Sequence, residues 1–342
     1  MIVPNRFPTI QSQRRIALIG ESPGSDEVKQ GEPFVGMSGR FLASLLSKAG
    51  VSRESCFLGN VSQHQPPGND ISLFKWDGPE IRAGLYQLKQ DLEIWKPNIV
   101  VLLGNVPLKA AKDVTTLHKL KPQSYRFKNT AWRGSLFLAN EESPVSGFKC
   151  LSTYHPAYAL RDYEVTPLLY FDLVRAVEES LTSTLVLPKR EFAIDLSASE
   201  IIFRLQNIRE LKLKVAIDIE GGIDSMSCIS FATSPYRAFI VPFFFKNGTR
   251  CFTEIEQVAI WRELILTLED PNVYKILQNG LYDRFVLHYS YRIRVRGVTD
   301  DTMVKHWELF CELKKSLAVQ ASIYTREPYW KHEGKAEEWQ GK

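Results

Sequence analysis

The sequence predicts an α/β protein of two domains, the first of them three layers with a mostly parallel sheet. In the first half of the chain, short apolar runs alternate with longer segments of helical periodicity, a pattern typical of a parallel sheet covered by helices. A chain of 342 residues exceeds the usual size of one domain. Composition changes near residue 182, and a stretch without helical period follows. We therefore expect domains at residues 1–181 and 199–342, joined by a linker at 182–198.

The strands and helices of the first domain follow from these patterns. Buried parallel strands are typically continuous apolar runs, and such runs occupy residues 16–20, 56–61, 98–103 and 149–154. Apolar residues recur at helical spacing in residues 38–49, 79–95 and 166–181. The polar residues 21–36, which contain glycine and proline, are expected to form a loop.

The second domain is expected to mix helices with an antiparallel meander. Its predicted helices are residues 199–211, 254–268 and 281–289. Its predicted strands are residues 214–219, 226–232, 237–245 and 275–278.

Charge and cysteine content limit the function classes. A net charge of +4 permits nucleic-acid binding without establishing it. The five cysteines are scattered and form no CxxC pair, which favours thiols in a reducing compartment over a disulfide framework. No apolar run reaches the roughly 20 residues that a membrane-spanning helix needs, and residues 1–15 lack the apolar core of a signal peptide. These features predict a soluble, cytoplasmic protein without a membrane partner.

The loop after the first predicted strand contains Gly20-Glu21-Ser22-Pro23-Gly24, which matches the nucleophile elbow G-x-S-x-G. An elbow needs a sharp turn from a strand directly into a helix. The residues that follow Gly24 have the composition of a loop. This disfavours a serine hydrolase.

A set of separated motifs supports a different interpretation of the same loop. The segments are Gly20-Glu21-Ser22-Pro23-Gly24 with Asp26-Glu27, Gly31-Glu32-Pro33-Phe34-Val35-Gly36 with Gly39, Asn60-Val61 with Pro66-Pro67-Gly68-Asn69, Lys96-Pro97 to Gly104, and Tyr154-His155-Pro156-Ala157 with Leu160-Arg161. Together and in this order they resemble the family 4 uracil-DNA glycosylases over about residues 14–181. The resemblance implies a three-layer α/β/α glycosylase-like domain that acts on DNA.

The resemblance also implies roles for five residues. Phe34 would stack on a flipped-out uracil, Asn60 would bind the edge of the base, and Glu27 would help to reject the methyl group of thymine. His155 would stabilise the charge on the departing uracil, and Glu21 would hold or activate water.

Each of these residues has an ordinary structural explanation when it is taken alone. Phe34 fits a core position and Asn60 a turn or cap, and the two glutamates fit solvated loop positions. A histidine before proline at a strand end, like His155, is usually structural. The glycosylase interpretation therefore depends on the whole set.

The sequence departs from that family at its iron–sulfur ligands, which require four suitably placed thiolates. No cysteine pair precedes the first motif, His64 stands where a cysteine is normal, and Gly84 lies near the expected last ligand. We therefore expect no iron–sulfur cluster. The loop that a cluster would brace must then be held by ordinary packing.

Carboxylates mark a second candidate site. Asp218 and Glu220 end a predicted strand and, at i and i+2, point to one face, where they can share hard divalent cations. Asn279 to Asp283 opens a predicted helix and supplies a third carboxylate. A solvated strand end is the alternative explanation of the first pair.

With the segments Asp300-Asp301-Thr302-Met303 and Ser322 to Tyr329, these carboxylates resemble the 3′–5′ exonuclease domain of family A DNA polymerases, especially those of bacteriophages. The resemblance covers about residues 205–342 and implies a ribonuclease H-like fold. It also implies two-metal hydrolysis in which Asp218, Glu220 and Asp283 bind Mg²⁺ or Mn²⁺. The third motif of that family should follow Tyr329 and is not found before Lys342, so the exonuclease domain is expected to be incomplete.

The two resemblances imply a DNA-processing enzyme. Its partners would be DNA and a polymerase domain or other replication subunits, and its location would be the cytoplasm of an infected bacterium. The alternative is a non-catalytic module in which both pockets bind DNA or a polymerase subunit without turnover.

Overall fold

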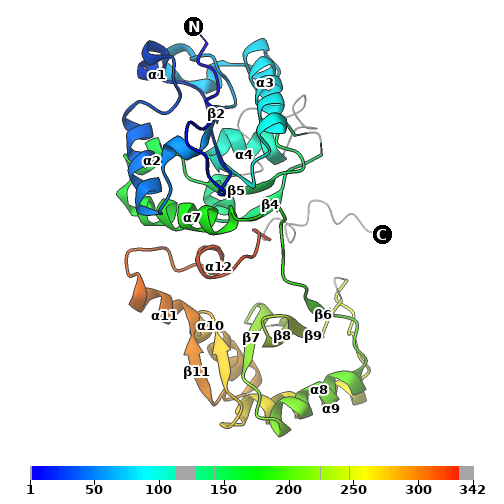
Figure 1. Cartoon of the computed structure of the whole chain (residues 1–342). Coiled ribbons are helices and arrows are strands. Elements are labelled where there is room, and N and C mark those ends of the chain that lie inside the picture. Colours follow the sequence, from blue (N-terminus) through cyan, green and yellow to red (C-terminus); the bar gives the residue numbers. More distant parts are fainter. Residues whose placement is uncertain (1, 113–127, 142, 224, 246, 331–342) are drawn as a thin grey trace. The chain divides into compact units, whose positions relative to one another are not determined.

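The computed structural model describes residues 2–112, 128–141, 143–223, 225–245 and 247–330 (Figure 1). The chain divides into two compact units. The first unit comprises Met1–Leu187 and Ala318–Lys342, and the second comprises Pro188–Leu317. Each unit is built around its own sheet and apolar core.

The sheet of the first unit has five strands in the order β2-β1-β3-β5-β4. Their bounds are β1 Ile16–Gly20, β2 Phe57–Asn60, β3 Ile99–Leu103, β4 Leu136–Leu138 and β5 Lys149–Thr153. The first three and β5 are parallel, and each is completely buried, which confirms the four apolar runs as strands. The short antiparallel edge strand β4 was not expected from the sequence.

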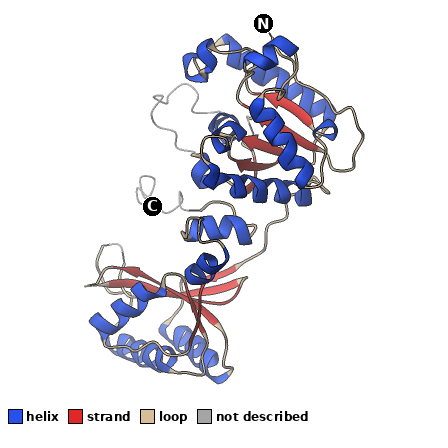
Figure 2. Cartoon of the chain, turned by 90° about the vertical axis from the view of Figure 1, so that its left-hand side faces the viewer, coloured by secondary structure: helices blue, strands red, loops and turns tan. Residues whose placement is uncertain are grey.

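Helices cover both faces of this sheet, as Figure 2 shows, so the predicted three layers are confirmed. The helices α3 (Pro79–Trp95) and α4 (Asn105–Lys112) pack on one face. The helices α2 (Met37–Lys48) and α7 (Thr166–Glu179) contact each other on the opposite face. Successive side chains of a strand point to opposite faces of the sheet. Since helices cover both faces, every residue of β1, β3 and β5 is buried.

Short helices and 3-10 turns connect the main strands and helices of the first unit. They are the helices α1 Ser25–Gln30, α5 Asn129–Trp132 and α6 Pro156–Ala159, and the 3-10 turns η1 Arg53–Ser55, η2 Pro67–Asn69, η3 Ile71–Leu73 and η4 Tyr163–Val165. Helix α1 lies inside the segment that we expected to be a loop. At its start the Glu27 carboxylate accepts a hydrogen bond from the Gly24 backbone N–H, as the third helical residue does in a capping box.

The second unit has a six-stranded sheet in the order β11-β10-β7-β8-β9-β6. The bounds are β6 Glu191–Ala193, β7 Val215–Gly221, β8 Met226–Ser234, β9 Arg237–Pro242, β10 Lys275–Leu277 and β11 Val298–Asp301. Strands β7, β8 and β9 form the predicted antiparallel meander. Strand β10 runs parallel to both β7 and β11.

Helices α8 (Ala198–Glu210), α9 (Glu254–Glu269) and α10 (Gly280–Tyr291) share one apolar core with this sheet. Helix α11 (Thr302–Leu309) follows β11, and α12 (Leu317–Tyr324) ends the described helices. The mixed α/β class predicted for both domains is therefore confirmed.

The domain boundaries differ from the expected ones at two places. Residues 191–193, expected within the linker, form β6 and pair with β9. Residues 318–330, expected in the second domain, belong to the first unit. The physical reason is the buried Arg133 of the first unit, whose guanidinium donates a hydrogen bond of 2.7 Å to Ser322. A buried guanidinium needs acceptors for its N–H groups.

No helix in the described ranges is both long and apolar enough to cross a membrane.

Candidate active site

A cleft of about 820 Å³ opens at the carboxyl edge of the first sheet. Clefts at this edge are the usual binding sites of parallel α/β sheets. The cleft lies where β1, β2, β3 and β5 end, because Glu21, Asn60, Gly104 and His155 all line it. All five residues proposed for the glycosylase site contribute to its wall, namely Glu21, Glu27, Phe34, Asn60 and His155.

Gly20, the last residue of β1, allows two of these side chains to meet. A Cβ atom on Gly20 would lie 2.5 Å from Oδ1 of Asn60 and 2.7 Å from Cζ of Phe34. Both distances are too short for van der Waals contact, so a side chain here would displace the Asn60 amide and the Phe34 ring. The Phe34 ring and the Asn60 amide therefore lie side by side over the end of β1.

Phe34 is held in an unusual backbone conformation. Its φ is 57°, which is uncommon for a residue with a side chain. Its N–H donates a hydrogen bond of 2.5 Å to Oε1 of Glu27. A Cβ on Gly39 of α2 would lie only 1.9 Å from the carbonyl oxygen of Phe34, so the helix approaches the loop closely because residue 39 is glycine.

Glu27 is buried and braces this loop from inside. Its Oε2 atom accepts a hydrogen bond of 2.7 Å from the Gly24 N–H, while Oε1 accepts the bond from Phe34. Burial raises the pKa of Glu27, and these two hydrogen bonds oppose the rise. Each carboxylate oxygen already holds a backbone donor. The side chain thus fixes the wall of the cleft as well as lining it.

His155 stands before α6 at the end of β5. Its Nδ1 atom accepts a hydrogen bond of 3.1 Å from the backbone N–H of Ala157. Burial, with a smaller contribution from Arg161, lowers the pKa of His155 to about 4. The imidazole is therefore neutral near pH 7 and carries its proton on Nε2. A ring fixed in this way presents a single N–H donor.

Glu21 is the half-buried carboxylate that follows β1. Burial, and then the negative charge of Asp70, raises the pKa of Glu21. The backbone oxygen of Glu21 accepts a hydrogen bond of 3.0 Å from Ser62, which fixes the start of the loop. A carboxylate of raised pKa accepts a proton more readily than an ordinary one does.

Another part of the cleft wall could not be predicted from the sequence. Asn105, Asn129 and Thr130 also line the cleft. The N–H of Asn129 donates to Oδ1 of Asn105 at 2.7 Å, and its side-chain amide donates to the carbonyl oxygen of Thr153. Asn129 begins the four-residue helix α5, which is too short to show periodicity.

Ordinary protein packing surrounds the two positions that suggested the absence of an iron–sulfur cluster. A Cβ on Gly84 of α3 would lie 2.2 Å from the carbonyl oxygen of Val61, so this glycine lets the helix rest on the backbone after β2. Nδ1 of His64 is buried and has no hydrogen-bond partner within the residues that the structure describes. The backbone of His64 forms an antiparallel bridge with Ile2.

In the second unit, the structure brings the three proposed metal ligands onto neighbouring elements. Asp218 and Glu220 lie on the exposed side of β7, as their spacing predicted. Asp283 of α10 is buried, and its Oδ1 accepts a hydrogen bond of 3.2 Å from the N–H of Ile219. That N–H is available because β10 pairs with β7 only at Val215 and Ala216.

The pKa of Asp283 is raised mainly by burial, and the negative charges of Asp301 and Glu220 add to the rise. Asp301 itself accepts hydrogen bonds from the N–H groups of Gly280 and Met303, at 2.8 and 2.9 Å, and so joins the starts of α10 and α11. Among the described residues, no three His, Cys, Asp or Glu side chains converge into a group that could hold a metal ion. Asp218, Glu220 and Asp283 are thus not gathered into one such group in this arrangement.

Comparisons with a family model and with individual proteins give the same result for the first unit. Residues 7–177 match the model of the uracil DNA glycosylase superfamily. The type-4 uracil-DNA glycosylase of Thermotoga maritima is 34% identical over 150 residues, which are 43% of this chain and 67% of that protein. The enzyme of the same name from Saccharolobus solfataricus is 32% identical over 176 residues, which are 50% of this chain and 74% of that protein.

Solved structures with a slight likeness to the chain include nucleases. The exonuclease domain of EXD2, soaked in Mn and GMP, has a TM-score of 0.27 and 18% identity, and the match covers 35% of this chain and 58% of that one. NrnC of Brucella melitensis has a TM-score of 0.27 and 16% identity, with coverage of 40% and 60%.

Proposed function

The chain belongs to the uracil DNA glycosylase superfamily, and we propose that its first unit excises uracil from DNA by hydrolysing the N-glycosidic bond. The observation that supports this most directly is that Phe34, Asn60 and His155 line the same cleft. An aromatic ring, an amide and a fixed N–H donor are what recognition and release of a pyrimidine require.

In the proposed complex, uracil leaves the base stack and enters the cleft. The Phe34 ring supports one face of the base. The Asn60 amide offers a donor and an acceptor to the polar edge of uracil. The Glu27 carboxylate keeps Phe34 in place through its N–H, and this fixed wall limits the room beside the base.

The proposed chemical step breaks the bond between C1′ of the sugar and N1 of uracil. The electron pair of that bond goes to uracil, and the Nε2–H group of His155 stabilises the resulting negative charge. Because this imidazole is neutral, it acts as a hydrogen-bond donor already oriented toward the leaving group. The Glu21 carboxylate holds the water whose oxygen bonds to C1′ and accepts a proton from it.

The sequence and charge of the molecule support DNA as the substrate. Arg161 lines the cleft and is exposed, so it can contact a phosphate beside the flipped nucleotide. The net charge of +4 adds a weak, non-specific attraction.

Incubation with uracil-containing DNA, single- and double-stranded, tests the proposal. We expect abasic sites in uracil DNA and none in the same sequence with thymine. If uracil DNA stays intact at a large excess of protein, the catalytic proposal is wrong. Uracil-dependent DNA binding without cleavage would instead support the alternative, a non-catalytic module.

For the second unit we propose a 3′–5′ exonuclease-like role on DNA, with Asp218, Glu220 and Asp283 as the residues for Mg²⁺ or Mn²⁺. The support is that two exposed carboxylates of β7 lie next to α10, which carries the third. The three carboxylates do not gather into one group in this structure, so we assign no catalytic step to a metal. Titration of the protein with Mn²⁺, with Asp218→Ala as the control, tests whether a cation binds here.

We also propose a setting in replication by a bacteriophage-type family A polymerase, in the bacterial cytoplasm. The support is the sequence resemblance of residues 205–342. Co-purification with a polymerase subunit from infected cells tests this setting, and a protein recovered without any replication component would contradict it.

A further inference from the structure

The free edge of β2 is covered by the N-terminal segment, residues 2–10, which we call the strap. Strand β2 is at the edge of its sheet, and an open edge leaves backbone groups unpaired. The strap runs antiparallel along it. The N–H of Arg6 donates to the carbonyl oxygen of Leu58 at 2.7 Å, and the N–H of Leu58 donates back to Arg6 at 2.9 Å.

The side chain of Asn5 connects the strap to the base-binding amide. Its Oδ1 accepts a hydrogen bond of 3.4 Å from the backbone N–H of Asn60, and its Nδ2 donates to Asp91 at 2.7 Å. A Cβ on Gly59 would lie 2.8 Å from that Oδ1 atom, so glycine is what permits the close approach. Asn5 thus fixes the backbone that carries the Asn60 side chain.

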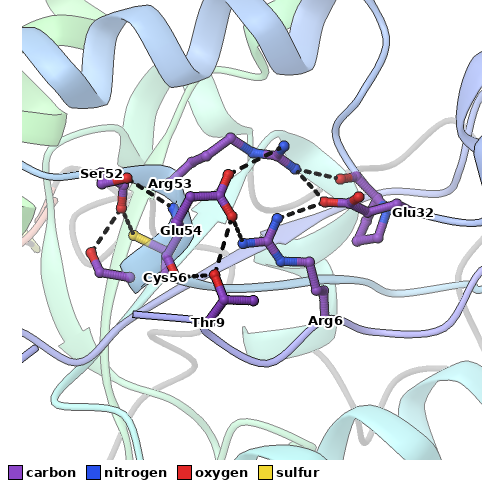
Figure 3. Close-up of polar contacts among 9 residues, drawn as sticks. Arg6, Thr9, Glu32, Ser52, Arg53, Glu54 and Cys56 are labelled. Atoms are coloured by element: carbon purple, nitrogen blue, oxygen red, sulfur yellow. Dashed lines mark hydrogen bonds and ion pairs between the residues drawn. The ribbon is translucent and has the colours of Figure 1, made fainter. Parts of the chain in front are cut away.

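The side chain of Arg6 connects the strap to the Phe34 loop, as Figure 3 shows. Its guanidinium donates to Oε1 of Glu32 at 2.6 Å and also binds the Glu54 carboxylate. Arg53 binds the same Glu32 oxygen at 3.2 Å and the carbonyl oxygen of Pro33 at 3.0 Å. These bonds hold the two residues that precede Phe34.

Two features indicate that these contacts act on the site. The Arg6 side chain is 15% exposed, so its ion pairs are shielded more than ordinary surface pairs, which contribute little. The hydrogen bond from Arg6 is also the main reason why the pKa of Glu32 is lowered. The loop before Phe34 is therefore held on one side by Glu27 and on the other by Arg6 with Arg53.

We propose that the strap is a positioning element of the uracil site, in which Arg6 sets the Phe34 loop and Asn5 sets Asn60. Asn5 and Arg6 lie outside residues 7–177, which match the superfamily model, so the inference rests on contacts of this chain. Its catalytic consequence rests on the proposed uracil excision. Small misplacements of positioning groups reduce rates strongly.

The test compares the full chain with Arg6→Gln, and with Arg237→Gln as the matched control. Arg237 pairs with Glu191 on the exposed surface of the second unit. For Arg6→Gln we expect the single-turnover excision rate to fall about 10- to 100-fold and inhibition by free uracil to weaken. Affinity for uracil-free DNA should stay the same, since phosphate contacts dominate it. Arg6→Lys should restore only part of the rate. The lysine keeps the positive charge, but its ammonium group cannot bridge two carboxylates as a guanidinium does.

Hydrogen exchange separates this inference from the proposed function. In Arg6→Gln we expect faster exchange in residues 31–36 and unchanged exchange in α3 and α7. If wild type excises uracil and Arg6→Gln matches it in rate and exchange, the strap has no positioning role. If wild type is inactive, the proposed function is wrong, and exchange at 31–36 alone decides the role of the strap. Should Arg6→Gln fail to fold, Glu32→Gln removes the same ion pair from the loop and decides the question in the same way.

Discussion

At the scale of single residues, the site depends on side chains in which each of two polar atoms has its own partner or role. Both nitrogens of His155 have a role, since Nδ1 receives the N–H of Ala157 and this leaves the proton on Nε2. Both oxygens of Glu27 are likewise occupied by backbone donors. A substitution at such a residue changes the local fold and the chemistry together, so each test needs a control for the fold.

We expect His155→Ala to lower the rate of uracil excision by about 10²-fold or more, because it removes a donor to the leaving group. The same change also removes the cap of α6, which typically lowers stability by about 1 kcal/mol. His155→Asn keeps a cap acceptor and serves as the stability control. The measurement is single-turnover excision, with urea unfolding of each variant. An unchanged rate in the folded alanine variant would contradict the proposed role.

The lowered pKa of His155 also predicts how stability depends on pH. The pKa is about 4 in the folded protein, against an ordinary value of 6.5. Between these values the unfolded chain binds more protons at this residue, so the contribution of His155 to the free energy of unfolding should fall as pH decreases from 6.5 and level off below about 4. Urea unfolding across this range, compared with His155→Asn, should show a smaller slope in the variant. Equal slopes would mean that His155 does not titrate as described.

At the scale of elements, the site is made where a loop lies against a helix. Helix α2 reaches the Phe34 carbonyl because residue 39 has no side chain. We expect Gly39→Ala to displace the loop and lower the free energy of unfolding by about 1–3 kcal/mol, the usual range for overpacking. It should lower uracil excision as well. Urea unfolding measures the first effect.

The matched control for this change is Gly222→Ala. No atom lies within 4 Å of a Cβ at that position, so we expect no large change in stability there. Equal stabilities of the two variants would show that the backbone around Phe34 can move aside without strain.

Some of these elements could be predicted from the sequence and others could not. Strands β1, β2, β3 and β5 are continuous apolar runs, so their burial could be predicted. Helix α1 could not be, since Glu27 starts it through backbone contacts within a polar loop. The five proposed site residues were found through the resemblance of their motifs to the family 4 uracil-DNA glycosylases, since each taken alone has an ordinary structural explanation. The strap contacts of Asn5 and Arg6 join residues up to 86 positions apart, and no local pattern reports such pairs.

We expect the purified protein to contain no stoichiometric iron. An iron–sulfur cluster needs four soft ligands, and the matching positions hold His64 and Gly84. A Cβ on Gly84 would lie 2.2 Å from a backbone oxygen, so a cysteine there would require α3 to move. Elemental analysis and the visible spectrum measure this directly. Iron at one cluster per chain, with broad visible absorbance, would refute the expectation.

At the scale of the whole molecule, the chain leaves the first unit at Leu187 and returns to it at Ala318. The returning segment completes a buried polar network. Arg133 donates to both oxygens of Asp172 and to Ser322, and Thr153 donates to Asp172 at 2.7 Å. Thr153 ends β5, two residues before His155, so the segment is connected to the strand that carries the proposed catalytic histidine.

We expect Ser322→Val to lower the free energy of unfolding of the first unit by about 1–3 kcal/mol, because one N–H of the buried Arg133 loses its acceptor. The control is Ser290→Val in the second unit. The Ser290 hydroxyl donates a hydrogen bond to the Ile223 carbonyl oxygen at an exposed site. Thermal unfolding measures the effect, and amide hydrogen exchange in each unit shows which unit is destabilised. A loss confined to the second unit would mean that the returning segment does not stabilise the first.

The second unit should show at most weak exonuclease activity in the chain of residues 1–342. Two-metal hydrolysis needs cations about 4 Å apart, one to activate water and one to stabilise the leaving oxygen. Among the described residues, no three His, Cys, Asp or Glu side chains gather into one metal-binding group, and Asp283 accepts a hydrogen bond from the Ile219 backbone. When catalytic groups act as a unit, removing one of them typically lowers the reaction rate by several orders of magnitude.

Binding of a single strand can persist without cleavage, because it depends on charge and aromatic platforms. The measurement is digestion of a labelled single strand with Mg²⁺ or Mn²⁺, compared with Asp218→Ala and with Asp195→Ala, which changes an exposed aspartate before α8. We expect the three proteins to be equally slow. Robust digestion that only Asp218→Ala abolishes would mean that cations draw the three carboxylates together, with a further ligand from another residue or subunit.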